Sequence, residues 1–199
     1  MAKTFAELSE KEKSNFEAQL KALGIEPGSV APHVVADGSL QLHPNEALTN
    51  VATQTVQVKN VAHLKKLWGV PDEAFKEPGK DKHIQYPAPL EDQRVKLLST
   101  GRKEVTEAAL SAQEHQAVSS AIEAYVNGDS KKVPAHLVEL ANTLSFPMAV
   151  RVMAAQNLTI TGAFPVSQAL VCGTITIEQG GYISVVGDAT INAQLITVV

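Results

Sequence analysis

The stretch that decides the fold reads VRVMAAQNLTITGAFPVSQALVCGT over residues 150–174 and ITIEQGGYISVVGDATINAQLITVV over residues 175–199. Written one above the other, the two copies align apolar residues at a constant offset of 25 positions, beginning with Val150 above Ile175. Such a period is typical of stacked β-strands, because one repeat cannot bury its apolar face alone. We therefore expect a short β-solenoid-like domain of two coils over 150–199.

Each copy contains short apolar runs that alternate with polar residues, and glycines such as Gly162 and Gly187 lie between them. Alternation predicts strands with one face turned inward, and the glycines predict corners. At this offset Thr159 would lie above Ser184, and the two Thr-x-Thr units would not stack, which argues against an ice-binding surface. The alternative is an antiparallel meander or sandwich, with a hairpin turn at 178–181.

Residues 1–149 read as a mostly helical region with a small β element, so the fold class is α+β. Apolar spacing and end signals predict several helices, over 7–22, 61–68, 92–98, 103–125 and 134–144. Asp37-Gly38 between apolar flanks predicts a β-hairpin, and alternation over 53–58 predicts a further strand, which places the β element near 34–58.

Residues 70–92 contain four prolines and several charges and read as a long surface excursion. Loops of this length without regular structure are uncommon in a compact domain unless they bind a ligand. The alternative is a strap held down by Phe75, Ile84 and Tyr86.

Charge and cysteine content restrict the function classes. The net charge is −4, and 35 of the 38 charged residues precede residue 150. The acidic balance gives no reason to expect a nucleic-acid partner, and no apolar run is long enough for a membrane span. The N-terminus lacks a signal-peptide pattern. We expect a soluble cytoplasmic protein, or one exported without a cleaved signal peptide. The single cysteine, Cys172, is expected to be a buried apolar residue rather than a nucleophile.

No catalytic motif stands out. The six histidines show no zinc spacing, and there is no phosphate-binding glycine loop and no nucleophile elbow. The charged residues of 150–199 are Arg151, Glu178 and Asp188, which lie at different repeat offsets. We therefore predict no catalytic residue, no cofactor and no metal site, and we lean against an enzyme.

The leading hypothesis is a structural or interaction protein that self-assembles through its β-coil into a homo-oligomer or filament. The expected assembly edge is the strand Leu195, Ile196, Thr197, Val198 and Val199, because no later segment of the sequence covers it. Exposed apolar strand edges recruit further strands unless charge, proline or a cap blocks them.

Two other functions stay open. The first is a carbohydrate- or surface-binding module, with a glycan contacted by Tyr182, Thr159, Ser184 and Asn192. The second is an enzyme whose site lies in the 70–92 region and uses His83 and Tyr86.

Overall fold

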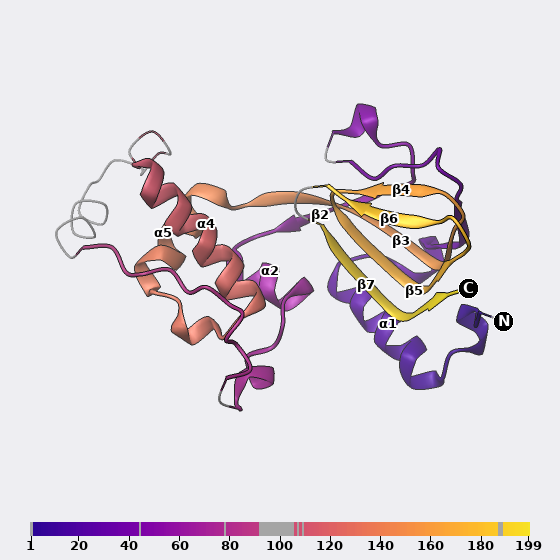
Figure 1. Ribbon diagram of the computed structural model, residues 1–199, viewed down its shortest axis with the longest axis horizontal. Helices are drawn as coiled ribbons and strands as arrows, with labels where there is room; N and C mark the ends of the chain where they lie inside the picture. Colours follow the sequence, from indigo (N-terminus) through magenta and orange to yellow (C-terminus); the bar gives the residue numbers. More distant parts are fainter. Residues whose placement is uncertain are drawn as a thin grey trace. The chain divides into compact units, whose positions relative to one another are not determined.

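The computed structural model describes residues 2–43, 45–77, 79–91, 106, 108, 110–186 and 189–199 (Figure 1). The chain forms two compact units, one made of residues 1–56 with 149–199 and one made of residues 57–148. This division differs from the expected one, which left 1–149 as one region, because the segment Met1–Val56 packs with the C-terminal strands. The helix expected over 92–98 and the start of the one over 103–125 lie outside the described residues.

The first unit, which we call unit 1, contains two sheets. Sheet A has the strand order β1 (Ala31–Ala36), β3 (Met148–Ile160), β5 (Ala169–Ile177) and β7 (Thr190–Val198), and β2 (Gln54–Val58) also pairs with β3. Sheet B contains β4 (Ala163–Val166) and β6 (Tyr182–Val185). From β3 onward the chain alternates between the sheets, and β3–β5, β5–β7 and β4–β6 all pair in parallel. The alternative of an antiparallel meander is therefore wrong. We call this arrangement the two-sheet stack.

The register of the stack corrects the predicted repeat. In sheet A, Leu158 pairs with Ile175 and Ile175 pairs with Ile196, so the spacing differs from one level to the next. In sheet B, Phe164 pairs with Ile183. All of these spacings are shorter than the one that would place Val150 beside Ile175, so the constant offset predicted from the sequence is wrong. Because side chains alternate with a period of two, offsets that differ by an even number all superimpose apolar residues on apolar residues.

The first level of the stack comes from the N-terminal part of the chain. Strand β1 pairs in parallel with β3, whereas Leu42 forms a bridge to Val166 of β4. The expected hairpin at Asp37-Gly38 is wrong, because its two arms join different sheets. Gly38, with a φ of 101°, lies at the corner between them, and the carbonyl of Ala36 accepts hydrogen bonds from the backbone of Thr161 and Gly162 at the next corner.

The space between the sheets is filled by apolar side chains from every level, including Leu42, Leu158, Phe164, Leu170 and Ile175. Cys172 belongs to this cluster and is fully buried, which confirms its expected role as a core residue. Burial raises the pKa of its thiol to about 12, so the sulfur stays protonated and unreactive at neutral pH.

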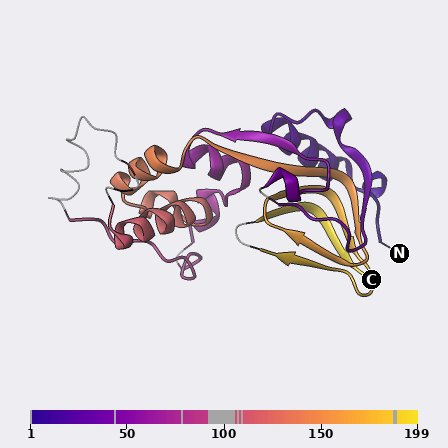
Figure 2. The same cartoon turned by 90° about the horizontal axis from the view of Figure 1, so that it is seen from above.

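Helix α1 (Glu10–Ala22) covers the outer face of sheet A, where it contacts β5 and β7 (Figure 2). Ser9 caps its first turn together with Glu12, and Gly24 follows its end with a φ of 73°. Phe16 and Leu20 are its buried residues. Strand β5 is consequently covered on both faces and is buried from Ala169 to Ile175.

The second unit, unit 2, is helical. Its described helices are α2 (Val61–Trp68), α4 (Ala112–Asn127) and α5 (Ala135–Ser145), which confirms helices in three of the expected places. Helix α4 packs against both α2 and α5, and Val118, Ala121, Leu137 and Ala141 are part of the shared core. Short 3-10 helices complete the described elements of the chain: η1 (Phe5–Glu7), η2 (Pro27–Ser29), η3 (Glu46–Leu48), η4 (Asp72–Phe75) and η6 (Ser130–Lys132).

Across the described residues, every helix is too short or too polar to cross a bilayer.

The packing of α1 on sheet A predicts the effect of Leu20→Ala. Leu20 is completely buried, and removing such a side chain costs about 2–5 kcal/mol because a cavity is left behind. We expect urea unfolding followed by the β-sheet circular dichroism signal to show this loss. The fluorescence of Trp68, the single tryptophan and a residue of unit 2, should be unaffected.

Glu17→Ala, at an exposed position of the same helix, is the control and should change the free energy of unfolding by less than about 0.5 kcal/mol. Equal effects of the two substitutions would contradict the packing of α1 on the sheet.

Candidate functional site

One end of the stack is formed by β6 and β7, and we call it the open end. Apolar side chains are exposed there at positions whose equivalents in the inner levels of the stack are buried. In the column Leu158, Ile175 and Ile196, the exposed fraction is 1%, 0% and then 53%. The neighbouring column ends in Val198, which is 74% exposed. The core of the stack is therefore uncovered at this end.

Exposed apolar residues gather there. Of the ten large apolar residues that are exposed in the described part of the chain, six lie between residues 182 and 199. They are Tyr182, Val185, Val186, Ile196, Val198 and Val199. A grouping of this kind on a protein surface is typical of a contact site.

The open end also presents two strand edges. Strand β7 is the last strand of sheet A and β6 the last strand of sheet B, so no described strand pairs with their outer edges. Neither strand contains proline or a charged residue, which are the usual means of blocking such an edge. Within the predicted assembly edge, Ile196, Val198 and Val199 are exposed, whereas Leu195 and Thr197 are half-buried.

The opposite end, which we call the closed end, is built differently. The backbone of Gln41 is engaged from outside by Asn50, whose side-chain oxygen accepts from the Gln41 N–H at 2.7 Å and whose N–H donates to the Gln41 carbonyl. Thr49 engages the backbone N–H and carbonyl of His43 in the same way. Strand β1, the edge of sheet A at this end, contains Pro32, whose carbonyl accepts a hydrogen bond from the side-chain amide of Asn157 in β3.

Side chains also cover the core at the closed end. Val34, Leu40 and Val51 are half-buried against the apolar cluster between the sheets. It was not predicted from the sequence that Val34, Leu40 and Val51 cover this end, because these residues lie more than a hundred positions before the strands that they cover. The segment with residues 39–51 lies beyond β4, on the side away from β6 (Figure 1).

The structure does not bring the four predicted ligand contacts together. Tyr182 and Ser184 belong to sheet B, where Ser184 pairs with Pro165. Thr159 and Asn192 belong to sheet A, where Asn192 pairs with Val171. The expected stacking of Thr159 above Ser184 is wrong because the two residues lie in different sheets.

Thr159 instead belongs to a column of threonines with Thr176 and Thr197. The expectation that the two Thr-x-Thr units do not stack is therefore wrong for Thr159 and Thr176, whereas Thr174 pairs with Asn157 instead of a threonine. The column does not form a bare flat face: His33 Nε2 lies 2.9 Å from the Thr159 hydroxyl oxygen, and all three threonines are half-buried. The nearby hollow, about 280 Å³, also includes Lys3 and Glu178.

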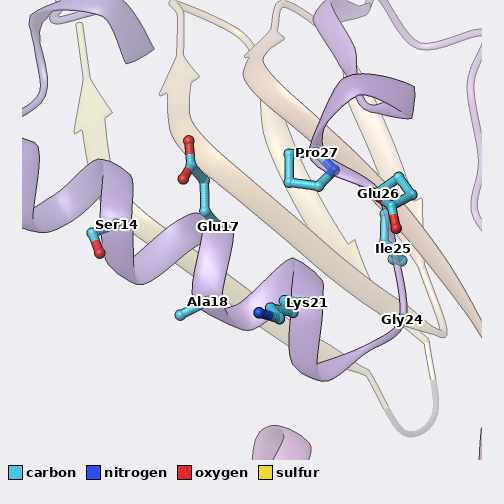
Figure 3. A pocket seen from close by; sticks show the side chains of 8 residues that line it. All are labelled: Ser14, Glu17, Ala18, Lys21, Gly24, Ile25, Glu26 and Pro27. Atoms are coloured by element: carbon cyan, nitrogen blue, oxygen red, sulfur yellow. The ribbon is translucent and has the colours of Figure 1, made fainter.

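A larger hollow of about 460 Å³ lies between α1 and the segment Gly24–Pro27 (Figure 3). Its charged residues, Glu17, Lys21 and Glu26, are exposed. Figure 3 shows them spread along the helix and the following segment rather than directed at one point. This arrangement provides no paired acid and base.

Unit 2 contains a half-buried charged cluster at the end of α4. The ammonium of Lys65 donates to the carbonyls of Tyr125 and Gly128 and lies 2.9 Å from the Asp72 carboxylate. Asp72 in turn accepts from the backbone N–H and the hydroxyl of Ser130. Burial raises the pKa of Asp72, but the hydrogen bonds from Ser130 and Lys65 outweigh it and lower the pKa to about 2.

The described part of the 70–92 excursion packs as a strap on the helical core of unit 2, the unit to which it belongs. Ile84, Tyr86 and Leu90 pack on its apolar core. The Tyr86 hydroxyl donates to Asp81 and accepts from the backbone N–H of Asp129, so this hydroxyl has a structural role. His83 is exposed.

Within the described ranges, no three histidine, cysteine, aspartate or glutamate side chains come close enough to hold a metal ion. Comparison of the chain with protein-family models, with curated proteins and with solved structures finds no match.

The Asp72 cluster predicts a pH dependence. A carboxylate whose pKa is lower in the folded state stabilises that state above its unfolded pKa, near 3.9, and this contribution disappears as the pH falls toward the folded value. We expect the difference in unfolding free energy between the wild type and Asp72→Asn to shrink between about pH 5 and pH 2. Urea unfolding followed by Trp68 fluorescence measures it.

Glu73→Gln, an exposed neighbour, serves as the control and should show no such trend. A difference for Asp72→Asn that is constant over this pH range would rule out the proposed role of the ionised carboxylate.

Proposed function

We propose that this protein is a self-associating structural protein, and that unit 1 is a short β-solenoid whose open end is the contact surface. The observation that carries the proposal is the column Leu158, Ile175 and Ile196, in which a buried core position becomes half exposed at the last level. The alternation of the chain between two parallel sheets is the arrangement expected of a solenoid.

The driving force for association is the free-energy cost of leaving both the apolar core and the backbone edges exposed to water. Uncovered apolar side chains lose about 25 cal/mol for each Å² that stays exposed. The outer edges of β6 and β7 present backbone N–H and carbonyl groups in the spacing that another strand requires. A partner that adds a strand to each of the two edges would satisfy both demands at once.

The composition of the surface favours pairing with another apolar edge. Strands β6 and β7 lack charged residues, so a second edge of the same kind meets no repulsion. The face of sheet A beside this edge is already covered by α1, which leaves the end of the stack rather than its flank as the contact. The candidate glycan and enzyme functions lack such a convergence of residues.

Val198→Lys tests this proposal. A lysine on a strand edge opposes pairing because its charge would have to be desolvated. We expect the wild-type protein to sediment as an oligomer at micromolar concentration and the variant to sediment as a monomer, with an unchanged circular dichroism spectrum.

Val185→Lys makes the same change on β6 and should have the same result, and it remains informative if Val198→Lys misfolds. The matched control is Val70→Lys, at a residue of unit 2 that is 37% exposed, and it should leave the oligomer intact. A wild type that is monomeric at all concentrations tested would refute self-association.

A further inference from the structure

The two ends of the stack differ, and this difference sets how two copies meet. We infer that the contact is head to head, with the open end of one copy against the open end of a second copy, so that assembly stops at a two-fold dimer. This inference rests on the proposed self-association and specifies its geometry and its partner, a second copy of this chain.

The closed end is unsuited to receive an open end. In sheet B, the outward backbone groups of Gln41 and His43 are occupied by Asn50 and Thr49. In sheet A, the outer edge of β1 exposes the polar side chain of His33. A head-to-tail contact, which leads to filaments, would require these hydrogen bonds to break first.

The open end, in contrast, matches itself. It consists of the edges of one strand from each sheet, with a strip of apolar core between them that includes Ile183, Ile191 and Ala193. A second copy presents the same two edges at the same separation, so both edges and the strip are covered together. A single added strand would cover one edge and leave the other exposed.

The symmetry follows from the strand direction. Two copies related by a two-fold axis that is perpendicular to the strands and passes through both sheets place β7 antiparallel to β7 of the second copy. Antiparallel pairing is at least as stable as parallel pairing for each residue. The paired sheets then have no open end, because each copy ends in its closed end.

Charge exchange distinguishes this geometry from a filament. The double variant Val185→Lys with Val198→Lys places positive charge on both edges of the open end, and the variant Val185→Glu with Val198→Glu places negative charge there. In a head-to-head contact each variant alone repels itself, whereas an equimolar mixture brings opposite charges together. We expect monomers from each alone and a restored one-to-one dimer from the mixture.

In a head-to-tail contact each charged edge would meet an unmodified closed end, so mixing would restore nothing. The matched control is Val35→Lys, at a β1 residue that is 47% exposed near the closed end. If the contact is head to head, this variant should form a dimer as readily as the wild type does. If the contact is head to tail, it should polymerise less than the wild type.

Sedimentation equilibrium over a hundredfold range of concentration completes the test. A mass that levels off at twice that of one chain, together with restoration in the mixture, supports the head-to-head dimer. A mass that keeps rising and falls with Val35→Lys, or a mixture that stays monomeric while the wild type associates, overturns the head-to-head geometry alone. A wild type that never exceeds one chain overturns the self-association on which it depends.

Discussion

No level of the two-sheet stack buries its apolar side chains completely without a neighbouring level on each side, and the rest of unit 1 follows from this constraint. Strand β3 is paired on both sides, by β1 and by β5, and its inward residues Leu158 and Ile160 are buried. Strand β7 is paired on one side, and its inward residues Ile196 and Val198 are exposed. Burial in such a stack is therefore decided by position along the stack as much as by residue type.

The two ends resolve this constraint in different ways. At the closed end, the N-terminal part of the chain supplies a level of its own, with β1 and Leu42, and then covers it with a hydrogen-bonded segment that includes Thr49 and Asn50. At the open end, no described residue performs this role. This difference between the two ends is the basis of the proposed head-to-head contact, because two open ends that cover each other leave no open end for a third copy.

Unit 2 is inserted between β2 and β3, and its stability rests on different interactions. Helices α4 and α5 share an apolar core and α2 packs against α4. A cluster of charged groups around Lys65 and Asp72 holds the end of α4. The carbonyls at the C-terminal end of α4 attract the Lys65 ammonium, in keeping with the direction of the helix dipole. The 70–92 excursion also has a structural role, because the Tyr86 hydroxyl donates to Asp81 and accepts from the backbone N–H of Asp129.

The local elements were predictable because their signals are local. Apolar spacing and capping residues predicted α1, α2 and α5, and alternation predicted β2 and the strands after residue 150, since a helix or strand depends on residues a few positions apart. Ile196, Val198 and Val199 of the predicted assembly edge are exposed, and their role as a contact stays a prediction.

Pairing depended on the tertiary structure. Alternation with a period of two fits the observed offsets and the predicted one equally well, so the sequence pattern alone did not select the register. The corner at Asp37-Gly38 carries the same residues as a hairpin turn, and only the position of β3 and β4 decides that its arms separate into two sheets. Likewise, the sequence by itself determined that the last strand is apolar and uncharged. The tertiary structure decided that the end with this strand is the uncovered one, because residues 31–51 fold onto the other end. Closing the long loop between these residues and the strands after residue 148 depends on packing between distant segments and not on local preference.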